Sequence, residues 1–166
     1  MSVFDFMQKF KLIDWYTLLV GLKHKWCNKE HLIYYGEEMI KQTINKEIGN
    51  DLAIIASGES LSTDDLVNIT LKFLSDNKKT MRHKEESEAL EKWRFAHLYW
   101  LLQKDGLEQE KIDILQELYA QFGFPEDMVS CSIYSQDNIA PLTAAENVVK
   151  KLSKQLHLEL VYNKIN

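Results

Sequence analysis

Five histidines and two cysteines are the residues of this chain best suited to metal binding or nucleophilic chemistry. The tightest group is His24-x-x-Cys27-x-x-x-His31, whose spacing resembles that of metal ligands on a helix. However, Asn28 predicts the start of a new helix within this group, and a structural zinc ion normally needs four ligands. We therefore expect neither a bound metal nor another cofactor.

Two histidines are candidates for acid-base chemistry. His83 lies beside Glu85 and Glu86 in a very polar stretch, which favours a solvated face over a shaped, partly dry site. His97 falls in an aromatic segment, where burial can shift the pKa of an imidazole. The favoured interpretation is a core histidine that is hydrogen-bonded to the backbone. The chain has no glycine-rich phosphate loop, HExxH, GxSxG or EF-hand pattern. We predict that the protein is not an enzyme, and keep an enzyme built around His97 as a rival hypothesis.

Acidic residues are concentrated between positions 105 and 127. This segment holds seven acidic side chains and one lysine, a net charge of −6, whereas the whole chain has a net charge of −5. A helix would place acidic residues at positions i, i+3 and i+7, here Glu110, Asp113 and Glu117, on one stripe of its surface. Two interpretations stay open: a solvated face, or a surface that attracts and selects a basic protein. The candidate partner-binding residues are Glu110, Asp113, Glu117, Glu126 and Asp127.

Length and composition limit the class of protein. A chain of 166 residues with 45% apolar and 27% charged residues is typical of one soluble globular domain, here residues 1–166. The acidic balance argues against direct nucleic-acid binding. No segment approaches about 18 uninterrupted apolar residues, so we expect no membrane span. The N-terminus lacks a signal-peptide pattern and the two cysteines lie far apart, which together predict a cytoplasmic protein.

Apolar periodicity predicts an all-α fold in which the helices form an antiparallel stack. An α-solenoid is one form that such a stack can take. The pattern predicts helices from Asp14 as cap to Trp26, from Asn28 as cap, and from Ser62 or Thr63 as cap. Residues 52–56 fit a buried helical turn or a strand. The polar stretch 75–88 is a candidate hinge, and a largely helical conformation of this stretch is the alternative. Residues 89–104 predict a central helix that is packed on more than one side.

The amphipathic segment 108–122 predicts a helix with a well-defined end. Gly123 suits a left-handed position, Phe124 would fold back on Tyr119 as in a Schellman cap, and Pro125 prevents continuation. After a less regular stretch, Thr143-Ala-Ala-Glu146 fits a capping box that opens a last helix to about residue 158. We expect the tail, 161–166, to be frayed.

Several aromatic motifs resemble a bacterial family of unknown function. They are Trp15-Tyr-Thr-Leu-Leu-Val-Gly-Leu22 with Trp26, Lys92-Trp93 through Leu102, Leu118-Tyr119-Ala-Gln-Phe122-Gly-Phe-Pro-Glu-Asp-Met128, and Tyr134. The resemblance covers most of the chain, and its motifs specify a fold better than an activity.

Small, acidic, helical bacterial proteins of this kind are similar to the immunity proteins of contact-dependent inhibition and polymorphic toxin systems. The resemblance implies a protein that binds and neutralises a cognate toxin, such as a basic nuclease. This function needs no cofactor and no catalytic residue. The alternative is a helical protein-protein interaction adaptor of an unrelated pathway.

Overall fold

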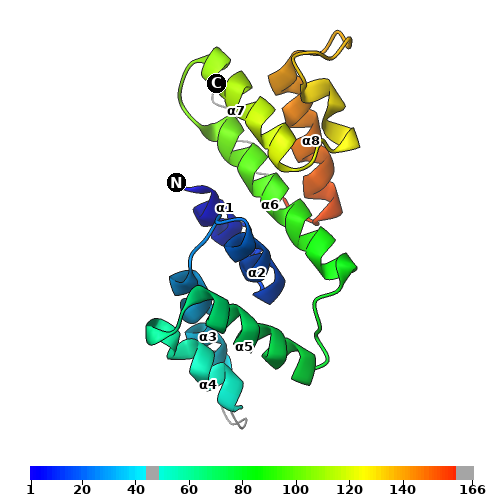
Figure 1. The fold of residues 1–166 in the computed structure, drawn as a ribbon. Helices are drawn as coiled ribbons and strands as arrows, with labels where there is room; N and C mark the ends of the chain where they lie inside the picture. Colours follow the sequence, from blue (N-terminus) through cyan, green and yellow to red (C-terminus); the bar gives the residue numbers. More distant parts are fainter. Residues whose placement is uncertain (44–48, 160–166) are drawn as a thin grey trace. The chain divides into compact units, whose positions relative to one another are not determined.

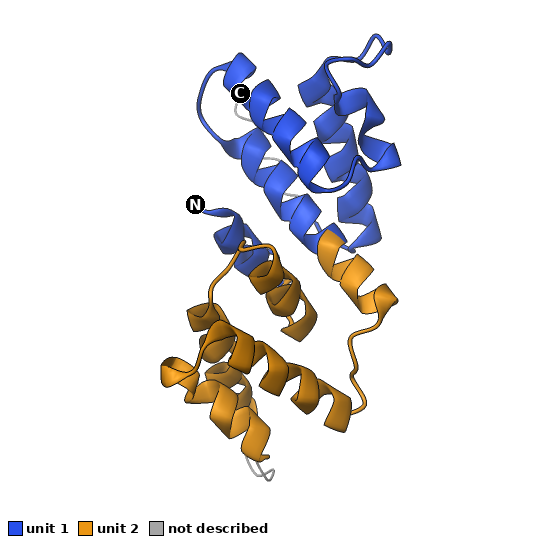
Figure 2. Cartoon of the chain, in the orientation of Figure 1, with its two compact units in different colours: residues 1–11, 91–166 blue, residues 12–90 orange. Residues whose placement is uncertain are grey.

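The computed structural model describes residues 1–43 and 49–159, and all regular structure within them is helical (Figure 1). The all-α prediction is therefore confirmed. The chain divides into two compact units, residues 12–90 and residues 1–11 with 91–166, which Figure 2 colours separately. No helix in the described ranges combines the length and the apolar character needed to cross a membrane.

The unit of residues 12–90 is built around Trp15. The ring of Trp15 meets the Tyr35 ring edge-on at 4.7 Å between centroids and the Phe73 ring at 5.5 Å. Aliphatic side chains from the α-helices of this unit complete the buried core. The elements are α2 (Trp15–Lys23), α3 (Lys29–Gln42), α4 (Asn50–Ala56), the 3-10 helix η1 (Gly58–Ser60), α5 (Thr63–Asp76) and the first turns of α6 (His83–Gln103).

The second unit is arranged around the rest of α6. Residues 93–98 are buried without interruption, so this helix is packed on several sides, as the sequence predicts. Phe10 packs edge-on against Phe95 and Tyr99, with centroids 5.1 and 5.0 Å away. Its other elements are α1 (Val3–Lys9), α7 (Glu108–Gln121), the 3-10 helix η2 (Glu126–Cys131) and α8 (Pro141–Gln155).

The predicted helix starts are confirmed at three positions. Asp14 and Asn28 each accept a backbone N–H from the third residue of the following helix, and Ser62 caps α5 in the same way. These oxygens satisfy N–H groups that have no partner within the helix. Residues 52–56 lie in α4, which confirms the helical alternative for this segment.

Three boundaries differ from the prediction. Helix α2 ends at Lys23, before Trp26, because Lys25 adopts a left-handed φ of 60° and reverses the chain. Helix α6 begins at His83, so only residues 77–82 of the candidate hinge lie between helices. The prediction that the last helix opens with a capping box at Thr143–Glu146 is wrong. Helix α8 begins earlier, with Pro141 in its first turn, where the fixed φ of proline suits a helix. The tail 161–166 lies outside the described residues.

The predicted end of α7 is confirmed in detail. Gly123 has φ 75°, and the N–H groups of Gly123 and Phe124 donate to the carbonyls of Ala120 and Tyr119 at 3.0 and 2.9 Å. The Phe124 ring meets the Tyr119 ring edge-on at 5.0 Å. This is a Schellman motif with its apolar contact, and it sets the direction in which the chain enters η2.

Substitution of Gly123 tests this cap. Gly123→Ala should lower the free energy of unfolding by about 1 kcal/mol, because a Cβ disfavours the left-handed conformation. Gly123→Asn is the matched control and should lose less, since asparagine tolerates that conformation. Urea unfolding followed by circular dichroism measures both values. Equal losses for the two variants would contradict the account of the cap.

Candidate functional site

The predicted acidic stripe, Glu110, Asp113 and Glu117, lies exposed on α7. Leu115 and Leu118 are buried on the opposite side of this helix and hold it in the unit. None of the three carboxylates takes part in an ion pair among residues 1–43 and 49–159. Asp113 Oδ1 accepts a hydrogen bond from the neutral Gln109 side chain at 2.9 Å, so the three negative charges on this stripe have no cation paired with them in the described structure.

The two remaining candidates, Glu126 and Asp127, begin η2 and face different surroundings. Glu126 is exposed, as expected for the rim of a surface. The Asp127 carboxylate is instead only 17% exposed and accepts bonds from Arg94 and Lys151. Asp127 therefore serves an internal ion pair, and its predicted role toward a partner stays a prediction.

Arg94 on α6 is the centre of this ion-pair network. Its guanidinium donates to both Asp127 oxygens, Nη1 to Oδ1 and Nη2 to Oδ2, the latter at 3.0 Å. Nη2 also donates to Glu91 Oε2 at 2.7 Å, and Lys151 Nζ on α8 reaches Asp127 at 3.1 Å. A forked pairing of this kind fixes orientation as well as distance. Three elements, α6, η2 and α8, are thus tied together through one carboxylate.

Burial and pairing act in opposite directions on these groups. Desolvation lowers the pKa of Arg94, but the hydrogen bonds to Asp127 and Glu91 outweigh it and raise that pKa above the usual value. Desolvation likewise raises the pKa of Asp127, but the bonds from Arg94 and Lys151 leave that pKa below its usual value. Both groups are therefore held in their charged forms.

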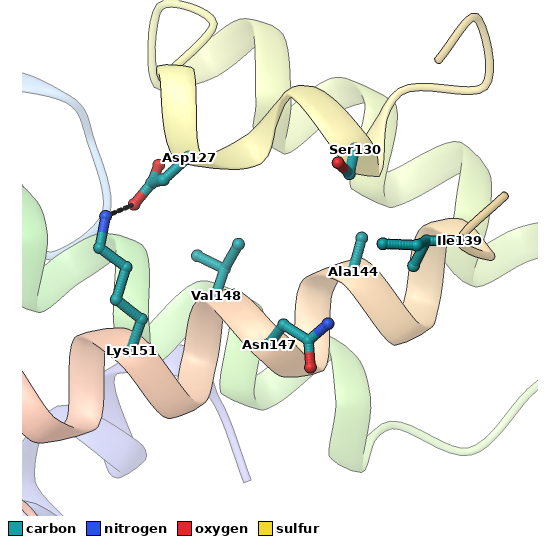
Figure 3. Close-up of a pocket in the computed structure, with 7 residues that line it drawn as sticks. All are labelled: Asp127, Ser130, Ile139, Ala144, Asn147, Val148 and Lys151. Carbon is teal, nitrogen blue, oxygen red and sulfur yellow. Dashed lines mark hydrogen bonds and ion pairs between the residues drawn. The ribbon is translucent and has the colours of Figure 1, made fainter. Parts of the chain in front are cut away.

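Two shallow hollows adjoin the Asp127–Lys151 ion pair. One, of about 190 Å³, lies between η2 and α8, with Ser130 above and Ala144 and Val148 below (Figure 3). The other, of about 390 Å³, is lined by Glu91, Arg94, Glu126, Asp127, Lys151 and Gln155. The first is a mixed polar and apolar depression, and the second is dominated by charged groups. Both are open to solvent, and neither is lined by His97.

His97 is part of the core of this unit. It is 8% exposed, its Nδ1 lies 2.8 Å from the Trp93 carbonyl oxygen, and its ring meets Phe122 edge-on at 5.5 Å. Burial lowers the pKa of His97, and the backbone bond opposes this shift only in part. The geometry is that of a neutral structural histidine bonded to the backbone.

The other chemistry-bearing residues are engaged locally. His31 Nδ1 accepts the Asn28 N–H at 3.1 Å, and the His24 ring stacks on Trp26 at 4.4 Å. Burial raises the pKa of the Cys27 thiol to about 12 and that of the Cys131 thiol to about 11, so both favour the protonated form. Within the described residues, no three histidine, cysteine or carboxylate side chains gather as a metal site.

Sequence reasoning missed Arg94, although a signal for it exists. Arg94 stands among apolar residues in a helix that is buried on several sides, and a buried arginine needs a carboxylate partner. Asp127, 33 positions further along, is that partner, but only the fold brings the two together.

Removal of the Asp127 charge tests the network. Asp127→Asn should lower the free energy of unfolding by about 2–4 kcal/mol, because it leaves the buried guanidinium with Glu91 as its remaining carboxylate. The adjacent, exposed Glu126→Gln is the control and should change stability by less than about 0.5 kcal/mol. Urea unfolding measures both variants. A loss for Asp127→Asn no larger than for the control would contradict a structural role for the ion pair.

The buried state of His97 predicts a pH dependence. Because its folded pKa lies below the unfolded value of 6.5, its neutral form stabilises the fold fully above pH 6.5, and this stabilisation is lost as pH falls below that value. The loss should approach at most about 1.4 kcal/mol per pH unit. His97→Gln should flatten the dependence between pH 7 and 5, measured as the free energy of unfolding in urea at each pH. A curve for His97→Gln with the same slope as that of the unsubstituted protein would show that His97 is not the group responsible.

Comparison with known proteins identifies a family for this chain. No curated protein and no solved structure matches the chain. Residues 4–160 match the model of a family described as uncharacterized proteins conserved in bacteria, DUF2247. This match confirms the resemblance to a bacterial family of unknown function, and the chain belongs to the DUF2247 family.

Proposed function

We propose that this protein is an immunity protein, which binds a cognate bacterial toxin of basic charge through the acidic stripe of α7 and so neutralises it. One observation carries the proposal. Glu110, Asp113 and Glu117 are exposed on one helix and make no ion pair in the described part of the chain. Three exposed carboxylates without an ion-pair partner attract a positively charged protein and help to orient it.

The scaffold beneath the stripe favours binding. Buried leucines hold α7 on one side, the Schellman motif fixes its end, and Gln116 bonds its neighbour η2. A surface that is already ordered loses little conformational entropy when a partner binds. A nuclease toxin is a suitable partner, because a protein that holds nucleic acid presents positive charge at its active surface.

The first part of the test identifies the partner. The purified protein, used as bait in lysates of its native host, should retain a basic protein that arrests growth when produced alone in a test bacterium. Co-production of the immunity protein should restore growth. A retained protein that has no effect on growth would favour the adaptor alternative and contradict the proposal.

The second part measures the contribution of the stripe. Asp113→Lys with Glu117→Lys should reduce the association rate with that partner by about tenfold or more and weaken its dependence on salt. Surface plasmon resonance at several salt concentrations measures both effects. Glu37→Lys with Glu59→Lys, at exposed positions of the other unit, makes the same change in net charge and serves as the control. Equal slowing by both pairs would show that the stripe is not the interface.

A further inference from the structure

Exposed apolar side chains are concentrated in residues 124–139, here called the apolar loop. It holds half of the large hydrophobic residues that are exposed in the described structure: Phe124, Val129, Ile133, Tyr134 and Ile139, with Tyr134 87% exposed. Single exposed apolar residues are ordinary, whereas several exposed along one segment make that segment a candidate interaction surface. This segment contains η2 and the connection to α8, and it belongs to the same unit as the acidic stripe.

Internal bonds hold the apolar loop in place. Gln116 of α7 donates to the Cys131 carbonyl at 3.0 Å and accepts the Ile133 N–H at 3.1 Å. The Tyr134 N–H donates to Ser132 Oγ at 3.1 Å, and Ser130 Oγ bonds Asp137. At its start, the Arg94–Asp127 ion pair fixes η2 to α6. The apolar side chains are thus exposed by an ordered backbone, which lowers the entropy that a partner must overcome.

The loop adjoins the acidic stripe. Gln116, which anchors Cys131 and Ile133, immediately precedes Glu117 and follows Asp113 by three positions on the same helix. Two positive groups of this unit, Arg94 and Lys151, pair with Asp127 and not with the stripe. The surface therefore combines an apolar patch with carboxylates that lack an internal counterion. Charge complementarity calls for a basic protein that presents an apolar side chain among its cations.

A depression beside the loop suits such a side chain. The hollow of about 190 Å³ between η2 and α8 is bordered by Ile139, Ala144 and Val148, with Ser130 and the Asp127–Lys151 pair at its polar edges (Figure 3). An apolar group inserted there would be covered by aliphatic carbons on α8 and by the loop.

We infer that the apolar loop is the centre of the interface with a basic partner protein, and that the acidic stripe lies beside it as the steering element. This inference rests on the proposed function and adds the surface that holds the partner after encounter. Apolar and aromatic side chains at the centre of an interface determine mainly how slowly the partner leaves, whereas charges determine how fast it arrives.

Site-specific photo-cross-linking in the native host tests the inference. A benzophenone amino acid is placed at Tyr134 in the loop, at Ala120 beside the stripe, or at the exposed Tyr34 of the other unit as a matched aromatic control. The same protein, with a pI above about 9, should be cross-linked from positions 134 and 120 and not from position 34.

Purified variants then measure the two contributions. Ile133→Ser with Tyr134→Ser should raise the dissociation rate of that protein by about tenfold or more and leave the salt dependence of its association unchanged. Tyr34→Ser should change neither rate.

The outcomes separate this inference from the proposed function. Cross-linking from position 120 without position 134, or unchanged dissociation of the loop variant, would overturn the inference and leave the acidic interface standing. Cross-linking from position 134 to an acidic protein or to a second copy of this chain would overturn the inference as well. The absence of cross-links from both positions would contradict both proposals.

Discussion

The bidentate pairing of buried Arg94 with Asp127 is the interaction on which the candidate surface depends. It joins the central helix α6 to the short helix η2, and Lys151 extends the connection to α8. Arg94 is 4% exposed, and a buried charge is costly unless it is paired, so the position of η2 is coupled to the stability of the core around it. The short helix η2 is also hydrogen-bonded to α7, because the Gln116 side chain donates to the Cys131 carbonyl. The exposed features of this unit are therefore arranged around a buried charge pair.

Much of the fold follows from local sequence signals. Caps at Asp14, Asn28 and Ser62, and the Gly123 motif, each satisfy backbone groups within a few residues, so the sequence alone can reveal them. Helix ends without glycine were harder to place. Lys25 adopts the left-handed conformation in which glycine is usual, and the helix boundary there carries no sequence mark. Pro141 is the opposite case: proline is a strong signal for the first turn of a helix, and the Thr-x-x-Glu pattern that follows it indicates a later start than the one observed.

The candidate site could be predicted only in part, for a related reason. The acidic stripe follows from helical periodicity, and its three carboxylates are exposed as that periodicity requires. The fates of Asp127 and Arg94 depend on a contact over 33 positions, which no local pattern encodes. The apolar loop shows no helical spacing of apolar residues that could reveal it in the sequence. Ile133 and Tyr134 lie outside any helix, and their backbone N–H groups are held by side chains.

The central claim is that this protein acts by contact, through the face formed by α7 and the apolar loop. Hydrogen-deuterium exchange of the complex with the basic partner protein tests it most directly, because it maps the protected backbone without any substitution. The account predicts slower exchange in residues 108–121 and 124–139 on binding, and unchanged exchange in α3. Protection confined to residues 12–90, with no change in α7 or the loop, would contradict it.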